Sequence, residues 1–357
     1  MTARRLPIRH MLVEPAAWRA MHRDPYDDDE IPVRVTAGGH WHEAVLRIRG
    51  GHTRGYPKPS YEIRIKNGHT FHWNAEYDDP AMMRNALSFY FFNRIGVHAP
   101  ATTHCRLVVN GESRGVYLEI EAVVPAFFRA RKLPYRSIVY AVNDRADFGL
   151  NEPRSRTPKR SLFAGYEQIA GDDGARSRLI HFIRGVSRLK GPALRRHLAA
   201  KLDIRNYLAW LAGAVLTGNY DGFEQNYALY EHMPTGKYRI IPWDYEGSWG
   251  RNCFGVPCGS SVVRLQGYNV LTAKLLAFRV YRNAYRALMR RLLREQFTVN
   301  GVMPAARRMR RAIAADLRAD TTRKHAYSVF QGETSFIAGY IRGRRRHLLR
   351  MLGKWKP

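Results

Sequence analysis

The stretches NYDGFEQNYALYE (residues 219–231) and IIPWDYEGSWG (residues 240–250) are the most informative part of this sequence. Two short runs of β-forming residues, YALYEH and KYRIIPW, flank a Thr-Gly turn and predict a hairpin. The two ends of a hairpin lie side by side. Asn226, just before the first strand, and Asp244, just after the second, are therefore expected to share one small volume, with Asp221 nearby.

The flanking sequence predicts a mostly helical region. The apolar segment 203–218, DIRNYLAWLAGAVLTG, begins with an Asp cap and ends in Gly, which predicts a helix that delivers the chain to Asp221. Arg-rich helices are expected from residue 270 onward, with candidates at 302–318 and 334–352. The segment NEPRSRTPKRS (151–161) is basic, contains Pro and lacks periodicity, so we expect a surface loop.

The first third of the chain predicts strands instead. Gly-Gly and Asn-Gly turns each separate two strand-like runs, and SYEIRIK alternates apolar with charged residues. One helix is expected, capped by Asp79 and ended by Gly96. Strands are predicted at 31–37, 41–50, 60–66, 103–109 and 113–123, and the helix at 80–95. The prediction is an α+β fold with a strand-rich N-terminal lobe (1–123) and a helical C-terminal lobe (124–357).

Composition narrows the class of protein. The 357 residues are 45% hydrophobic and carry a formal net charge of +29, which predicts a globular chain with an acidic partner such as nucleic acid, a membrane surface or phosphorylated ligands. Arg is spread along the whole chain, however, and a codon bias would produce the same charge. No apolar run is long enough for a membrane span, and the N-terminus lacks the apolar core of a signal peptide, so we expect a cytoplasmic origin. Free thiols are expected at Cys105, Cys253 and Cys258, which form no CxxC pair.

The oxygen-bearing side chains around the hairpin indicate a divalent metal. Carboxylate and amide oxygens suit Mg²⁺ or Mn²⁺. In protein kinases an Asp accepts the substrate hydroxyl proton, an Asn five residues later holds one metal, and an Asp after a hairpin holds the metals that bridge the phosphates. Asp221, Asn226 and Asp244 follow that order, although the usual HRD and DFG strings are absent. Alternatively, the Asp and Asn satisfy backbone groups of a turn.

A second motif could cradle phosphates. The stretch RIRGGHTRGYPKPSYEIRI (47–65) places three glycines among Arg49, Arg54 and Lys58. Glycines let backbone amides approach phosphate oxygens, and a basic side chain neutralises their charge. An ordinary Gly- and Pro-containing turn between strands is the alternative. Lys58 lies at the edge of a predicted strand, where the head group of a lysine is expected to be solvated.

Five stretches in this order resemble one known family: RGGHTRGYPKPSYEI, NAEYDDPAMMRNALSFYFFNRIG, VNGESRGVYLEIEAV, NYDGFEQNYALY and IIPWDYEGSWGR. The sequence closely resembles the spore coat protein H (CotH) family of atypical protein kinases, over roughly residues 10 to 350. The resemblance implies a divergent, bilobal protein-kinase-like fold that uses ATP with Mg²⁺ or Mn²⁺. It also implies that Ser-rich spore coat proteins are the substrates, phosphorylated on Ser, in the cytoplasm of the mother cell and then in the spore coat.

The resemblance assigns roles to individual residues. It makes Asp221 the acidic residue of the catalytic loop, which accepts the hydroxyl proton, Asn226 and Asp244 the metal ligands, and Lys58 the phosphate lysine. Arg54, in the Gly-rich turn before Lys58, is a further candidate for nucleotide binding. Pro59 stands where relatives often continue with Lys.

Other positions have more than one interpretation. Glu121, on a predicted strand that runs toward the lobe junction, is expected either to hydrogen-bond the nucleotide or to pair with an Arg. Arg84 and Asn85 match the helix motif of the family, where we favour packing over contact with ATP. Trp243 and Trp249 are expected to pack beneath the metal loop.

Two other function classes remain as alternatives. The first is a non-catalytic organiser of the coat that binds partner proteins through its basic surface, and it would keep its function without Asp221. The second is a metal-dependent nucleic-acid enzyme. We do not expect nucleic acid as the partner, because neither a groove-reading helix nor a nuclease motif is recognisable.

Overall fold

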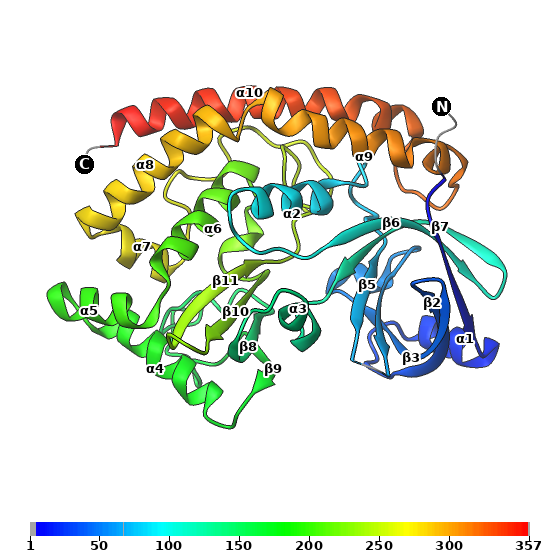
Figure 1. The fold of residues 1–357 in the computed structure, drawn as a ribbon, viewed down its shortest axis with the longest axis horizontal. Coiled ribbons are helices and arrows are strands. Elements are labelled where there is room, and N and C mark those ends of the chain that lie inside the picture. Colours follow the sequence, from blue (N-terminus) through cyan, green and yellow to red (C-terminus); the bar gives the residue numbers. More distant parts are fainter. Residues whose placement is uncertain (1–4, 67, 356–357) are drawn as a thin grey trace. The chain divides into compact units, whose positions relative to one another are not determined.

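The computed structural model describes residues 5–66 and 68–355 (Figure 1). Its strands and short turns of 3₁₀-helix are β1 (Ile8–Val13), β2 (Ile31–Ala37), β3 (His40–Arg49), η1 (His52–Gly55), β4 (Ser60–Ile65), β5 (Thr70–Asn74), β6 (Thr102–Val109), β7 (Glu112–Glu121), β8 (Tyr135–Ala141), β9 (Tyr166–Gly171), η2 (Asp221–Phe223), β10 (Tyr227–His232) and β11 (Lys237–Pro242). Its α-helices are α1 (Pro15–Arg23), α2 (Arg84–Arg94), α3 (Pro125–Ala130), α4 (Ala175–Arg188), α5 (Gly191–Lys201), α6 (Ile204–Thr217), α7 (Val270–Leu276), α8 (Arg279–Glu295), α9 (Val299–Ala319) and α10 (Tyr327–Lys354). The α+β class predicted from the sequence, with strands early and helices late, is confirmed.

The described residues fall into two compact units, each made of separate chain segments. Unit 1 contains the residues up to Leu87, Pro100–Phe127 and Pro304–Ser335. Unit 2 contains Ser88–Ala99, Phe128–Met303 and the residues from Phe336 onward. The sequence predicts a single division of the chain, after residue 123. These units differ from that division because a late helical segment packs with the N-terminal strands.

Unit 1 is built around a closed barrel of strands. The strand order is β1-β2-β3-β4-β5-β7-β6, and β1 closes the barrel by pairing antiparallel to β2 and parallel to β6. Alternating side chains from these strands fill the interior, and they include the buried aromatic residues Tyr61, Trp73 and Tyr117. The two predicted hairpins of this region are β2-β3 and β6-β7, in the expected places.

Helix α2 begins later than its sequence predicts. The Asp79 carboxylate accepts hydrogen bonds from the backbone N–H groups of Ala81, Met83 and Arg84, so it caps the turn as expected. The helix nevertheless starts at Arg84 rather than at Pro80. Met82 has a φ of 53°, in the left-handed region, and this conformation interrupts a continuous right-handed helix.

Unit 2 is organised around an antiparallel sheet with the order β11-β10-β8-β9. Three registers align one end of all four strands: Tyr227 pairs with Ala141 and with Pro242, and Ala141 also pairs with Tyr166. The residues just outside these positions, including those that precede β10 and follow β11, therefore emerge at the same end of the sheet. The predicted hairpin of β10 and β11 is confirmed.

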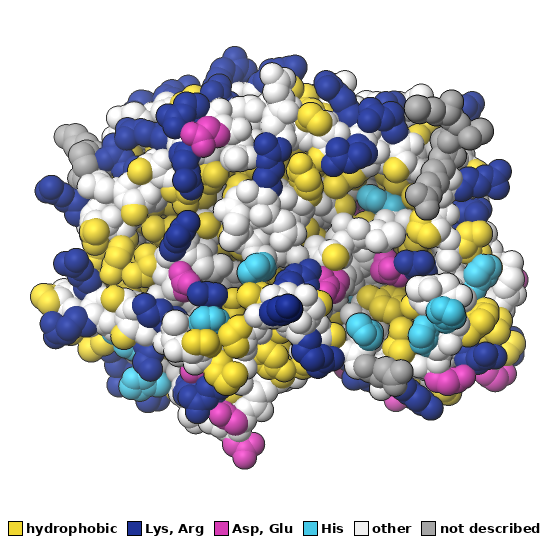
Figure 2. All heavy atoms as spheres, viewed as in Figure 1, with side chains coloured by type: hydrophobic (Ala, Val, Ile, Leu, Met, Phe, Trp, Pro, Cys, Tyr) yellow, Lys and Arg dark blue, Asp and Glu magenta, His cyan; other side chains and the backbone are white. Residues whose placement is uncertain are grey.

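Basic side chains are widely spread over the surface. Figure 2 shows Lys and Arg over the whole visible face, with fewer Asp and Glu between them. In the described part of the chain, no helix is both long and apolar enough to cross a membrane. On the face shown in Figure 2, charge alone does not mark one region as a binding surface.

Candidate functional site

Helix α6 places Asp221 through defined caps. Asp203 accepts a hydrogen bond from the backbone N–H of Asn206 at the start of the helix. At its end Gly218 adopts a φ of 77°, and its N–H donates to the carbonyl oxygen of Ala214. This left-handed turn directs the chain into the short 3₁₀ turn Asp221–Phe223, where Asp221 is half-buried.

The hairpin brings Asn226 and Asp244 to the same end of the sheet, as the sequence predicts. The N–H of Trp243 donates to the carbonyl oxygen of Asn226 at 3.1 Å, so Asp244 directly follows the residue opposite Asn226. Asn226 is also fixed to β8, because its N–H donates to the carbonyl oxygen of Ala141 at 3.0 Å. Two short oxygen-bearing side chains thus leave neighbouring strand ends.

Both residues adopt a backbone conformation that few residue types tolerate. The φ of Asn226 is 59° and that of Asp244 is 57°. Asn and Asp enter this left-handed region more readily than other non-glycine residues, although at some cost in conformational energy. Residues held in such conformations cluster at functional sites, where the surrounding structure fixes the direction of the side chain.

Asn219 links the loop of Asp221 to the loop of Asp244. Its side-chain N–H donates to the backbone carbonyl oxygen of Asp244 at 3.0 Å. Between the two loops Gly222 leaves no room for a side chain, because an added Cβ would lie 2.9 Å from the Asn219 amide nitrogen and 3.2 Å from the Tyr245 hydroxyl. Asn219 is not among the site residues predicted from the sequence, where its only signal is its position two residues before Asp221.

Cys253 lies beside Asp221. The Cys253 thiol is hydrogen-bonded to the Asp221 side chain, and burial together with the Asp221 charge raises the pKa of this thiol to about 12. The thiol therefore stays protonated at neutral pH and does not bring a second charge to Asp221. Because the two residues are far apart in the chain, no sequence pattern predicted this contact.

The donor set of these loops fits a hard divalent cation. Asp244 supplies a carboxylate and Asn226 an amide oxygen, which is the kind of partial shell that Mg²⁺ completes with water and substrate phosphates. Among the residues that the structure describes, no cluster of three or more His, Cys, Asp or Glu side chains is arranged to hold a metal ion. A shell of one carboxylate and one amide does not require such a cluster.

In unit 1 the predicted phosphate cradle is a loop that Arg54 holds together. The Arg54 guanidinium donates to the carbonyl oxygens of Gly50 and Tyr26 and forms an ion pair with Asp28 at 2.7 Å. The side chain of Arg54 is 17% exposed. The structure thus places Arg54 at the expected loop, with its guanidinium used to fix the loop conformation.

Lys58 differs from the solvated strand-edge lysine that its sequence context predicts. Its side chain is 4% exposed, and its Nζ donates to the carbonyl oxygen of Val116 at 2.8 Å and to Oδ2 of Asp320 at 3.2 Å. The Nζ also lies 4.8 Å from the centre of the Tyr117 ring. The expectation that this head group is exposed is wrong, because a residue 262 positions away supplies a buried carboxylate.

The Lys58 and Asp320 pair is tightly enclosed. Burial lowers the pKa of Lys58, although Asp320 opposes this effect. Burial alone would raise the pKa of Asp320. The net effect is a lowered pKa, because the charge of Lys58 and the hydrogen bonds from Thr322 and from the N–H of Val116 outweigh burial. Gly115, with a φ of 82°, gives the pair its space, since a Cβ there would lie 2.4 Å from the Asp320 carboxylate oxygens.

Replacing Lys58 by Met is expected to destabilise unit 1. The change leaves the Asp320 carboxylate buried without its cation, a loss of about 3 kcal/mol in the free energy of unfolding. Chemical denaturation measures this loss, and Lys66→Met, at an exposed position after β4, is the matched control. Adding Asp320→Asn to Lys58→Met should recover part of the loss. A fully stable Lys58→Met chain would contradict the pairing.

The other residues selected from the sequence have structural contacts. Oε2 of Glu121 accepts a hydrogen bond from the backbone N–H of Ala101 at 3.0 Å. Trp249 is fully buried, which confirms its predicted packing. Trp243 is half-buried and stacks on Tyr140, with ring centres 5.6 Å apart.

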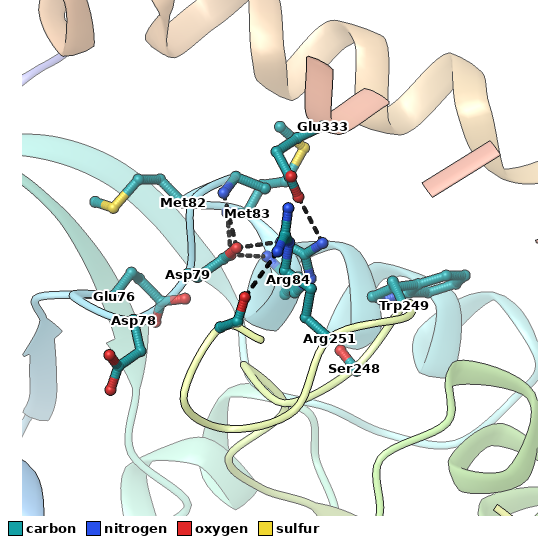
Figure 3. A network of polar contacts seen from close by, with 12 residues as sticks. Glu76, Asp78, Asp79, Met82, Met83, Arg84, Ser248, Trp249, Arg251 and Glu333 are labelled. Carbon is teal, nitrogen blue, oxygen red and sulfur yellow. Dashed lines mark hydrogen bonds and ion pairs between the residues drawn. The ribbon is translucent and has the colours of Figure 1, made fainter. Parts of the chain in front are cut away.

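Arg84 is the centre of a buried ionic network in unit 1. Figure 3 shows its guanidinium between the carboxylates of Asp79 and Glu333. Arg84 is 0% exposed, and its distance to Glu333 Oε2 is 2.6 Å. The two carboxylates outweigh the effect of burial and raise the pKa of Arg84. The packing role favoured for Arg84 agrees with these contacts.

The sequence is similar to one protein-family model and to two Bacillus subtilis proteins. The family model described as CotH kinase protein matches residues 46–348. The chain is 35% identical over 349 residues to the inner spore coat protein H of Bacillus subtilis (strain 168), with 96% of each chain covered. It is 27% identical over 252 residues to the inner spore coat protein H-like protein of the same organism, with 69% of this chain and 70% of the relative covered.

Solved structures show only distant likeness. The Helicobacter pylori proinflammatory kinase CtkA gives a TM-score of 0.32 at 9% identity, with 92% of both chains covered. A chain of the Shewanella oneidensis MR-1 HipA, HipB and operator DNA complex gives 0.36 at 13% identity, with 80% of this chain and 59% of that chain covered. The family assignment rests on the sequence comparisons, which extend over most of the chain. The chain therefore belongs to the CotH kinase family.

Proposed function

We propose that this chain is an ATP-dependent protein Ser/Thr kinase that phosphorylates serines of Ser-rich spore coat proteins and is needed for coat assembly. The observation that carries the proposal is the shared end of the unit 2 sheet, where Asn226 and Asp244 leave neighbouring strands and Asn219 ties the Asp221 loop to Asp244. Membership of the CotH kinase family supports the same reaction.

Each residue has a distinct chemical task in this proposal. Asp221 orients the serine hydroxyl and accepts its proton, and the protonated thiol of Cys253 helps to hold the carboxylate in place. Asn226 and Asp244 hold the divalent cation, Mg²⁺ or Mn²⁺. Held there, a bound cation would supply positive charge to offset that of the ATP phosphates.

The nucleotide contacts are proposed from unit 1. Lys58, Arg54 and Glu121 are the candidates, and the first two already have anionic partners in Asp320 and Asp28. A basic residue that is held in place by a carboxylate is oriented before the phosphates arrive, which lowers the entropic cost of binding them. By its relation to an inner spore coat protein, we also propose that the chain acts in the cytoplasm of the mother cell and then in the spore coat.

Phosphate transfer to a coat protein is the direct test. The purified chain is incubated with labelled ATP, Mg²⁺ or Mn²⁺ and a Ser-rich coat protein, and the phosphorylated positions are mapped by mass spectrometry. We expect phosphoserine that requires both ATP and the metal. Coat assembly without phosphate on any partner would instead support a non-catalytic organiser.

Asp244→Asn is expected to weaken metal-dependent nucleotide binding. The substitution keeps the shape of the side chain but removes the ligand charge, so the affinity for ATP with Mg²⁺ should fall by about 10- to 100-fold. Affinity without metal should change little. Fluorescent ATP titrations with and without Mg²⁺ measure both values, and Asp173→Asn, at an exposed position of unit 2, is the control. Equal losses with and without Mg²⁺ would argue against a metal ligand.

A further inference from the structure

A basic pocket in unit 2 lies away from the residues assigned to catalysis. It has a volume of about 480 Å³ and is formed by the loop after β8 together with helix α4. Arg160, Arg184 and Arg188 line it beside the apolar side chains of Leu162 and Ile180. From its sequence, this basic loop is predicted only to be a surface loop.

Helix α4 presents its arginines to the pocket as one row. Ile180, Arg184 and Arg188 are spaced four residues apart, so they lie along one face of the helix. Arg176 continues the row. Its guanidinium lies 5.1 Å from the centre of the Phe163 ring and 3.5 Å from the Ser161 hydroxyl, which attaches the loop to the helix.

In the described part of the chain, the arginines that line the pocket lack acidic partners. Within residues 5–66 and 68–355, Arg160, Arg184 and Arg188 form no ion pair with Asp or Glu, and all three are exposed. The nearby acids are already neutralised, since Asp147 pairs with the buried Lys159 at 2.6 Å and Glu152 pairs with Arg145. The net field in the pocket is therefore positive, and an anion would meet free guanidinium groups.

The pocket and the candidate catalytic residues are attached to the same end of the sheet. The pocket loop leaves β8 at Ala141, whose carbonyl oxygen accepts the hydrogen bond from Asn226. Farther along, the hydroxyl of Tyr227 donates to the carbonyl oxygen of Ala146. The pocket loop also approaches the segment between Asp221 and Asn226 through one short bridge. The N–H of Val270 donates to the carbonyl oxygen of Asp147, and the side-chain N–H of the preceding Asn269 donates to the carbonyl oxygen of Phe223.

From this arrangement we infer that the pocket binds a phosphoserine of the substrate while another serine of the same peptide is at Asp221. Guanidinium groups bind phosphate oxygens in bidentate pairs, and the apolar walls suit the side chains next to the phosphoserine. None of the lining residues is aromatic, which disfavours single-stranded nucleic acid as the ligand, because such ligands stack on aromatic rings. This inference rests on the proposed kinase function: a product serine of one transfer would guide the next.

Binding is tested without catalysis. The Asp221→Asn chain, without ATP, is titrated with a fluorescent Ser-rich peptide that carries one phosphoserine, and with the same peptide unphosphorylated. We expect the phosphopeptide to bind at least about tenfold more tightly, and Arg184→Gln with Arg188→Gln to abolish that difference. Arg307→Gln with Arg311→Gln, two exposed residues of α9 at the same spacing, removes the same charge and should change the affinity less than about twofold.

Three outcomes would overturn the inference. One is equal affinity of the parent chain for the two peptides. Another is a loss of phosphopeptide affinity in the α9 control as large as in the pocket variant, which would indicate attraction by the overall positive charge. A third is an RNA oligonucleotide whose binding depends steeply on salt and is lost in the Arg184→Gln and Arg188→Gln variant, while the phosphopeptide does not bind. Thermal unfolding of each variant should match that of the parent chain, since all four arginines are exposed.

Kinetics separate this inference from the proposed function. In the chain with Asp221 intact, the phosphorylated peptide should be the better substrate. The double variant Arg184→Gln with Arg188→Gln should phosphorylate both peptides equally fast, at the rate at which the parent chain phosphorylates the unphosphorylated peptide. If neither peptide is phosphorylated but phosphopeptide binding persists, the kinase proposal fails and the binding pocket stands. If both are phosphorylated equally by the parent chain, the pocket has no role in substrate choice.

Discussion

Replacing Asp221 by Asn is expected to reduce phosphate transfer by roughly 10² to 10⁴ while binding of ATP with metal largely survives. The amide keeps the size of the carboxylate and much of its hydrogen bonding, but it cannot accept the hydroxyl proton. Asn226, Asp244 and Asn219 keep their backbone positions, because their hydrogen bonds do not involve the Asp221 carboxylate. Single-turnover transfer from labelled ATP and a separate nucleotide titration measure the two quantities.

Glu224→Gln is the matched control for this prediction. Glu224 is exposed and lies three residues after Asp221, and its replacement by Gln removes the same charge. The phosphate-transfer rate of this variant should stay within about threefold of the parent value. Comparable losses in both variants would indicate a general effect of negative charge near the loop. In spores that produce only the Asp221→Asn chain, normal phosphoserine content and normal coat assembly would sink the proposed mechanism.

The predictions made from the sequence succeeded where short-range rules decide the structure. The Asp cap and Gly end of α6 and the hairpin of β10 and β11 follow from residues within a few positions of one another. Because a hairpin fixes its own register, the neighbouring positions of Asn226 and Asp244 could be predicted without knowledge of the rest of the fold.

Long-range contacts account for most of what the sequence could not predict. The sequence around Lys58 predicts an exposed strand-edge residue, whereas in the fold Lys58 is buried against Asp320. Closure of the barrel depends on β1, which pairs in parallel with β6 almost one hundred residues later. The contact of Cys253 with Asp221 likewise joins loops that no local pattern connects. In each case the partner is chosen by packing rather than by neighbouring residues.

Local prediction also failed at one position with unusual backbone geometry. The sequence after Asp79 has a good cap and a Pro suited to the first turn of a helix, yet α2 starts only at Arg84. The left-handed φ of Met82 and the three hydrogen bonds to the Asp79 carboxylate form a compact turn instead. That turn places Asp79 against the guanidinium of Arg84.

Replacing Arg84 by Met is expected to lower the free energy of unfolding by about 3–5 kcal/mol, because two buried carboxylates lose their shared cation. The side chains of Asp79 and Glu333 are 0% and 2% exposed, so water cannot replace the lost interactions. Chemical denaturation measures the change. Arg94→Met, which removes an exposed Arg from the other end of α2, should cost less than about 1 kcal/mol.

A second substitution tests whether the lost stability comes from the uncompensated charge. Adding Glu333→Gln to Arg84→Met neutralises one of the two buried carboxylates, so the double variant should be more stable than Arg84→Met alone. Nucleotide affinity, measured where the variant is still folded, should stay near the parent value if Arg84 only supports packing. If Arg84→Met has the parent free energy of unfolding but a lower affinity for ATP, Arg84 contacts the nucleotide. The motif MMRNAL would then belong to the binding site rather than to the core.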